Sequence, residues 1–311
     1  MGNKVYQIIT EQIIELLEQG TVPWRQPWNG NRFPKNARSN RAYSGINPFI
    51  LNHTALKQGY IDNRWLTVRQ ANQLGGRIIK GEKATMVVFW KPAKSRDENA
   101  GAGEAAHAEK NIPVLRYYNL FNVEQCQNLG LEPAAPPASG DHAPQQAAEQ
   151  IVKSMPNPPK TIQGLKASYN YRADTVTIPP LHLFENAARY YSTYFHELVH
   201  STRHPSRTGR DTKIPTNQND RRYSKEELIA EMGAAMLCGT AGLSDQTLSA
   251  SAAYIKSWLE NLQNDPRMVI QAASKAQQAV NYILGLVSDH QPLVSEKESA
   301  CNQAHGAVSN I

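Results

Sequence analysis

Two histidines four residues apart, His196 and His200, with Glu197 directly after the first, are the residues of this chain that most clearly suggest chemistry. On a helix this spacing is one turn, so both imidazoles leave the same face and can hold one metal ion. Zinc accepts neutral imidazole nitrogens, and a carboxylate beside its open coordination position can take a proton from bound water. The pattern predicts His196 and His200 as metal ligands and Glu197 as the catalytic base of a hydrolase. The alternative is a pair of packed histidines.

The surrounding sequence predicts that this motif lies inside a helix. No Gly or Pro occurs between Asn186 and Pro205, and the Asn186 side chain can cap the first turn. The helix can therefore place both imidazoles on one face.

A third ligand is expected from the segment that begins at Tyr223. Glu227 and Glu231 share one face of a predicted helix there, whereas Glu226 points about 100° away. We therefore predict Glu227 as the ligand and Glu231 as its supporting partner, with Glu231 or Glu226 as the alternative ligand. Ser224 and Glu227 also form a possible capping box, which would occupy Glu227 at the helix start. Two imidazoles and a carboxylate suit Zn²⁺, and Mn²⁺ or Co²⁺ could occupy the same donors.

Positive charge is concentrated at the start of the chain. The whole chain carries a formal charge of +6, whereas residues 1–91 hold 13 Lys and Arg against 5 Asp and Glu. The rest of the chain is therefore slightly acidic. This asymmetry favours a polyanion as partner of the N-terminal part.

Aromatic and cationic side chains alternate in the N-terminal part, most densely in residues 22–36, which are too rich in Pro, Gly and Asn for regular structure. Basic groups can follow phosphates while aromatic rings stack on unpaired bases, so single-stranded DNA is the expected partner. The alternative for the tryptophans is a role in the core beneath a long loop. The candidate DNA-binding residues are Trp24, Arg25, Trp28, Arg32, Lys35, Asn36, Arg38, Arg41, Tyr43, Asn47, Arg69, Lys80 and Lys83.

Cysteine usage and the N-terminus indicate a cytoplasmic protein with no membrane partner. Cys126, Cys238 and Cys301 lie far apart, which implies neither a disulfide framework nor a cysteine zinc site. Residues 1–19 contain three glutamates and do not resemble a signal peptide, and no apolar run reaches the length of a membrane span.

The predicted fold class is α+β with two domains, because 311 residues are enough for two cores. The expected divisions are residues 1–129, a Pro- and Ala-rich linker at 130–146, a mainly helical domain with a small sheet at 147–288, and a disordered tail at 289–311. Helices are predicted at 5–17, 47–58, 67–74, 187–204, 225–237, 252–262 and 267–286. Strands are predicted at 77–79, 85–91, 114–121, 168–171 and 175–178.

A basic tract follows His200 and contains Arg203, Arg207, Arg210 and Lys213. It is expected to be a solvated surface, and the alternative is an extension of the anion-binding surface into the second domain.

Several fragments together resemble the ArdC-type antirestriction proteins, whose N-terminal domain is also similar to that of TraC-type primases. The N-terminal fragments include Pro34-Lys35-Asn36, Tyr43-Ser44-Gly45-Ile46-Asn47 and Lys80-Gly81-Glu82-Lys83. The C-terminal fragments are the nine residues from Tyr194 to Thr202 and the run Glu226-Glu227-Leu228-Ile229-Ala230-Glu231. The resemblance implies a single-stranded-DNA-binding domain joined to a zincin-like metallopeptidase domain, and protection of incoming plasmid DNA from host restriction.

Two functions follow from these expectations. In the first, the N-terminal domain binds exposed single strands and the metal site cleaves a protein found there, for which a restriction component is one candidate. In the second, bound DNA is protected by masking alone and the metal site is structural or inactive. A nuclease is less favoured because phosphodiester cleavage commonly uses paired metals. A primase is less favoured because the N-terminal part has no evident carboxylate cluster for magnesium.

Overall fold

The computed structural model describes residues 2–28, 33–95, 110–132, 143–210, 221–243 and 252–286. Its α-helices are α1 (Gly2–Glu18), α2 (Asn47–Gln58), α3 (Val68–Gln73), α4 (Ala143–Ser154), α5 (Ala187–Ser201), α6 (Arg221–Ala241), α7 (Ala252–Asn264) and α8 (Met268–Ile283). Its strands are β1 (Lys35–Asn36), β2 (Arg64–Leu66), β3 (Arg77–Ile78), β4 (Thr85–Ser95), β5 (Lys110–Asn122), β6 (Cys126–Gln127), β7 (Lys160–Gln163), β8 (Ser168–Asn170) and β9 (Thr175–Ile178).

The α+β fold expected from the sequence is confirmed, and the signals at helix ends act as predicted. Helix α2 ends at Gly59, which adopts a left-handed conformation with φ of 73°. Helix α3 begins at Thr67, whose side chain forms a capping box with Gln70. These local interactions explain why both helices could be located from the sequence.

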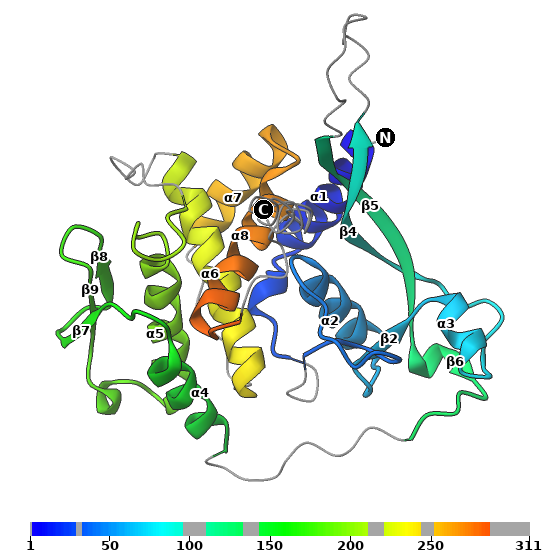
Figure 1. Ribbon diagram of the computed structural model, residues 1–311, viewed down its shortest axis with the longest axis horizontal. Coiled ribbons are helices and arrows are strands. Elements are labelled where there is room, and N and C mark those ends of the chain that lie inside the picture. Colours follow the sequence, from blue (N-terminus) through cyan, green and yellow to red (C-terminus); the bar gives the residue numbers. More distant parts are fainter. Residues whose placement is uncertain are drawn as a thin grey trace, which may run out of the picture.

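The N-terminal half is built around a long β-ribbon. Strands β4 and β5 pair antiparallel from Thr85–Leu120 to Ser95–Lys110, and β5 also pairs with β2 in a sheet of order β1-β2-β5-β4. Helix α1 packs on β5 and helix α2 on β4, so both helices hold the strands in place (Figure 1). The short strands β3 and β6 form a separate pair beside α3.

The second half carries a small three-stranded sheet and a helical bundle. The sheet has the order β7-β9-β8, with β7 parallel and β8 antiparallel to β9, and it lies at one end of the molecule against α5 (Figure 1). The predicted hairpin is β8–β9, whereas β7 was not predicted because its four residues are all exposed and give no buried alternation. Helix α6 packs on α4, α5, α7 and α8 and so occupies the middle of the bundle.

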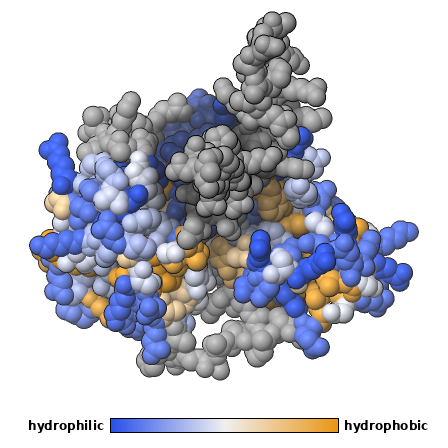
Figure 2. All heavy atoms as spheres, viewed as in Figure 1, coloured by the Kyte–Doolittle hydropathy of each residue, from blue (hydrophilic) through white to orange (hydrophobic). Residues whose placement is uncertain are grey.

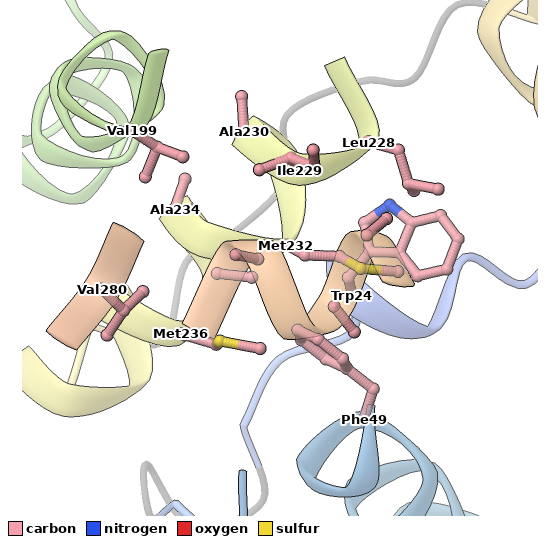
Figure 3. Packing of buried hydrophobic residues seen from close by; sticks show 14 of the residues in the cluster. Trp24, Phe49, Val199, Leu228, Ile229, Ala230, Met232, Ala234, Met236 and Val280 are labelled. Carbon is pink, nitrogen blue, oxygen red and sulfur yellow. The ribbon is translucent and has the colours of Figure 1, made fainter. Parts of the chain in front are cut away.

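One hydrophobic core joins the two halves of the chain. Trp24 and Phe49, from the N-terminal half, are almost fully buried and lie beside Leu228, Met232 and Met236 of α6 (Figure 3). Apolar burial on this scale is the main stabilising contribution in a folded domain. The two parts predicted from sequence as separate cores are therefore packed against a common helix.

The predicted linker is shorter at its C-terminal end than expected. Helix α4 begins at Ala143, inside the range 130–146, because Pro144 suits the first turn of a helix and the Gln and Ala residues that follow favour its continuation. The predicted tail at 289–311 lies outside the described residues. Within the described part of the chain, no helix combines the length and apolar character needed to cross a membrane.

Candidate metal centre

Helix α5 places the two histidines one turn apart, as predicted. The side chain of Asn186 accepts a hydrogen bond from the Arg189 backbone at 2.9 Å and caps the helix start. Phe195, Leu198 and Val199 are buried, so the apolar face of α5 fixes the rotation of the helix. The imidazoles therefore point to a defined place beside α6.

The side chains of His196, His200 and Glu227 converge on one point. The Nε2 atoms of the histidines are 3.1 Å apart, and the Glu227 carboxylate oxygens lie 3.4 Å from His196 Nε2 and 3.5 Å from His200 Nε2. Donors around a tetrahedral zinc ion, each at 2.0–2.1 Å, are separated by about 3.3 Å. The three side chains therefore fit one divalent ion of this size, and they are a group that could hold a metal.

Close packing of α5 on α6 brings Glu227 to the histidines. A Cβ atom added to Gly233 would lie 2.7 Å from Val199 Cγ2, so only glycine permits this approach. Helix α6 begins at Arg221, and Ser224 therefore lies inside it, where its hydroxyl accepts a hydrogen bond from Asn261. The capping role that competed for Glu227 is excluded.

The carboxylate that supports the histidines is Glu226, which corrects the prediction of Glu231 for this role. Glu226 Oε1 lies 3.2 Å from His200 Nδ1 and accepts a hydrogen bond from Arg210 at 2.8 Å. Glu231 instead forms an ion pair with Arg25 at 2.5 Å. Helical periodicity alone could not show this, because Glu226 and Glu227 both reach His200 only when α6 crosses close to α5.

The carboxylates change the protonation of the site when no ion is bound. Burial opposes the charged form of His200, but attraction to Glu227 and the contact with Glu226 outweigh it and raise the pKa of His200 to about 10. Burial likewise opposes ionisation of Glu227, but the two histidines hold the pKa of Glu227 well below its usual range. Without an ion, the cluster therefore holds a protonated His200 beside an ionised Glu227. A divalent ion can replace the proton of His200.

Glu197 is held in the turn of α5 that joins the two histidines. It is 8% exposed, which is low for a glutamate. A carboxylate at this position is shielded from bulk water while belonging to the helix that carries both imidazoles.

The basic tract after His200 is not the solvated surface that was expected. The Arg207 side chain is fully buried and forms an ion pair with Asp174 at 2.8 Å, and Arg203 and Arg210 are also buried. Arg210 donates to the Val199 carbonyl at 2.8 Å as well as to Glu226. Guanidinium groups are used here because they satisfy the carbonyls at the end of α5 and neutralise buried carboxylates. Lys213 lies outside the described residues.

Five of the predicted DNA-binding residues lie in the interior. Trp24 and Trp28 are 1% and 3% exposed, and the Arg25 side chain is 10% exposed and paired with Glu231. The hydroxyl of Tyr43 donates to the Trp65 carbonyl at 3.1 Å, and the amide of Asn47 donates to the Val88 carbonyl at 2.7 Å. These five side chains stabilise the fold and cannot stack on bases or contact phosphates from these positions. For the tryptophans, the core alternative was the right one.

The remaining candidates lie at or near the surface. Asn36 is half-buried and bonds to Gln70, and the neighbouring Arg38 donates to Gln73 at 2.6 Å, so the segment after β1 is joined to α3. Arg32 falls outside the described residues. The exposed cations among the candidates are Lys35, Arg38, Arg41, Arg69, Lys80 and Lys83. In Figure 2 the side of the molecule around α3 and β6 is mostly hydrophilic, with hydrophobic residues interspersed.

The ribbon adds exposed residues that the sequence analysis did not select. Tyr117 is 55% exposed and the neighbouring Arg116 is also exposed. Tyr118, 44% exposed, packs edge-on against Phe89 at 5.3 Å between ring centroids. The signal that could have found them is the run of four polar and aromatic residues, 116–119, between the buried Leu115 and Leu120.

Models of two domain families match the chain. The N-terminal domain of the anti-restriction factor ArdC matches residues 3–121, and a zincin-like metallopeptidase domain matches residues 146–275. Among curated proteins, the uncharacterized protein y4eC of Sinorhizobium fredii (strain NBRC 101917 / NGR234) is 32% identical over 92% of this chain and 94% of that protein.

Two Escherichia coli proteins named DNA primase TraC are also similar, at 32% and 30% identity over 90% and 97% of this chain. The chain spans only 20% and 29% of the length of these two relatives.

Solved structures of the antirestriction ArdC protein from plasmid R388 share the fold. The metal-free form is 36% identical, with a TM-score of 0.71 over 89% of this chain and 96% of that one. The Mn(II)-bound form is 33% identical, with a TM-score of 0.72 over 92% and 99%.

Proposed function

The chain belongs to the family of ArdC antirestriction proteins, and on this premise we propose that it binds single-stranded DNA and hydrolyses peptide bonds in a protein found there. This activity would protect incoming plasmid DNA from host restriction. The observation that carries the proposal is the convergence of His196, His200 and Glu227 at distances that suit one divalent ion, with Glu197 in the same helix. The zincin-like domain implies a metal, and we propose Zn²⁺, with Mn²⁺ as the alternative because an R388 ArdC structure contains it.

Each side chain of the centre has a distinct role in this proposal. His196 and His200 offer their Nε2 atoms and Glu227 its carboxylate to the ion. Glu226 holds the His200 ring through Nδ1, which leaves Nε2 free to bind. An ion held there would supply Lewis-acid chemistry. Glu197 would accept a proton from the water whose oxygen adds to the peptide carbonyl, and would pass that proton to the amine as the C–N bond breaks.

Exposed cations support DNA binding by the N-terminal domain. Lys35, Arg38, Arg41 and Arg69 come from β1, the segment after it and α3, and the hydrogen bonds of Asn36 and Arg38 hold these elements together. Tyr117 and Tyr118 of β5 supply exposed rings of the kind that stack on unpaired bases. Cations that contact phosphates and aromatic rings that stack on bases do not depend on the base sequence. This combination favours binding of single-stranded DNA with little sequence preference over base recognition in a duplex groove.

The variant Glu197→Gln separates proteolysis from DNA masking. It should abolish cleavage, detected as new protein N-termini in cells that express the protein, while fluorescence anisotropy shows unchanged affinity for a single-stranded oligonucleotide. Restriction of a transferred plasmid should then rise to the level seen without the protein. Full protection by Glu197→Gln would instead establish masking as the mechanism.

A further inference from the structure

Helix α6 carries three glutamates within two turns of each other near the proposed ion position. Only one of them, Glu227, faces both histidines. The side chains of Glu226, Glu227 and Glu231 are 9%, 14% and 10% exposed. Glu227 and Glu231 are four residues apart and therefore lie on the same face of the helix. A buried carboxylate one turn from an ion is a natural competitor for it, because divalent ions bind carboxylate oxygens well.

Each of the two glutamates that do not face both histidines is paired with an arginine. Arg210 donates to Glu226 at 2.8 Å. Arg25 bonds Glu231 through two nitrogens, Nε at 3.1 Å and Nη2 at 2.5 Å, one to each carboxylate oxygen. A two-point pair of this kind fixes the direction of the carboxylate as well as neutralising it. Glu227 is left to face His196 and His200.

Arg25 comes from the N-terminal half and is held rigidly against α6. Its guanidinium lies 6.0 Å from the centre of the Trp258 ring, and the preceding Trp24 packs edge-on against the same ring at 5.4 Å. Figure 3 shows Trp24 beside Leu228 of α6, one turn before Met232. Three residues after Arg25, Trp28 donates to the Ala235 carbonyl at 3.0 Å. Trp24 and Trp28, which precede and follow Arg25 in the chain, are therefore anchored on α7 and α6, and these anchors position the guanidinium.

From these contacts we infer that Arg25 is a positioning residue for the metal centre, which holds Glu231 away from the ion so that Glu227 is the carboxylate ligand. Without Arg25, the Glu231 carboxylate is buried without its two-point partner, one turn from Glu227. The nearest way to neutralise it is to turn toward the ion and crowd the coordination position that water needs. The inference deepens the proposed function, since it takes the ion to bind at His196, His200 and Glu227. It also makes the metal centre depend on how the N-terminal segment packs on α6.

The test uses the full chain loaded with Co²⁺, whose visible absorption reports coordination geometry, and Zn²⁺ affinity measured by competition with a chromogenic chelator. Arg25→Gln should change the Co²⁺ spectrum toward the weak absorption of higher coordination and, because the Glu231 carboxylate is then an added ligand, tighten Zn²⁺ binding. Arg25→Gln combined with Glu231→Gln should restore both the spectrum and the affinity. A purely structural role for Arg25 would not give this rescue, because the double variant still lacks the ion pair.

Two single variants complete the design. Glu231→Gln alone should bind Co²⁺ with the spectrum of the unmodified protein, and this expectation holds even if Arg25→Gln fails to fold. Arg64→Gln, which removes a similar pair with Asp62 at 2.6 Å, is the matched control and should leave the spectrum unchanged. An unchanged spectrum in Arg25→Gln, a defect that persists in the double variant, or a lost site in Glu231→Gln would each overturn the inference. None of these readouts requires peptidase activity, so a chain that cuts no protein would overturn the proposed function and leave this result standing.

Discussion

Nδ1 of His200 and Oε1 of Glu226 lie 3.2 Å apart, on the side of the imidazole opposite the ion position. A carboxylate at Nδ1 keeps the proton on that nitrogen, so that Nε2 presents its lone pair to a metal. Glu226 is itself held by Arg210, which gives the imidazole a fixed orientation before any ion arrives.

Replacing Glu226 by Gln should therefore weaken metal binding without removing a ligand. The amide keeps the size of the side chain but loses the charge that favours the Nε2 lone pair, and an affinity loss of roughly tenfold is expected. A competition titration with a zinc chelator measures it. Glu260→Gln, at an exposed position of α7, is the control. Equal affinities in the two variants would show that Glu226 has no influence on the ion.

Trp28→Ala should destabilise the whole protein. Trp28 is 3% exposed, stacks on Phe49 at 5.7 Å and donates its indole N–H to the Ala235 carbonyl of α6, so truncation leaves a cavity and removes this hydrogen bond. The expected loss in the free energy of unfolding is about 3–5 kcal/mol. Urea denaturation followed by circular dichroism measures this loss, with Trp90→Ala, at a position 42% exposed, as the milder control. A small loss accompanied by weakened DNA binding would return Trp28 to the surface role predicted from sequence.

The contrast between the histidines and the tryptophans shows what the sequence could predict. His196 and His200 are joined by one turn of one helix, so their convergence is a local property that spacing reveals. Glu226, Glu227 and Glu231 could not be sorted by spacing, because their roles depend on the rotation of α6 against α5 and on Arg25 and Arg210 from other segments. A tryptophan next to an arginine in the sequence can be buried in a core or exposed on a surface that binds nucleic acid. Only long-range packing distinguishes the two.

Acid should weaken the contact between the small sheet and the segment after α5. Burial opposes ionisation of Asp174, but hydrogen bonds from Arg207 and Tyr169 and the charge of Arg207 outweigh it and leave the Asp174 pKa below its ordinary value. A carboxyl with a lowered folded-state pKa stabilises the protein above its unfolded pKa, about 3.9, and this contribution is lost as the pH falls through the folded value.

The corresponding variant is Asp174→Asn. Thermal denaturation should show it less stable than the unmodified protein at neutral pH. The difference should shrink as the pH falls below about 4 and through the folded-state pKa, below which the carboxyl is protonated in both states. Glu185→Gln, at the exposed end of a surface pair with Arg189, should show little difference at any pH. A constant gap between Asp174→Asn and the unmodified protein across the whole range would contradict the assignment.

Removing Arg38 and Arg41 together should weaken DNA binding uniformly across sequences. Both are exposed in the segment after β1, and a cation that pairs with a phosphate releases a counterion when the strand binds. For single strands, replacing both by Gln should reduce the slope of log affinity against log salt by about 1.4. Anisotropy titrations with two oligonucleotides of different sequence, at several salt concentrations, measure the change.

The control for that measurement is Lys153→Gln on α4, an exposed cation in the second half of the chain. It should leave the salt dependence unaltered, because a loss of charge alone does not remove a phosphate contact. If Lys153→Gln and the double variant lowered affinity equally, binding would reflect the net charge of the molecule. A defect confined to one oligonucleotide would instead indicate base recognition by Arg38 or Arg41. The expected result, a loss shared by both oligonucleotides and absent from the control, places phosphate contacts on the segment between β1 and α2.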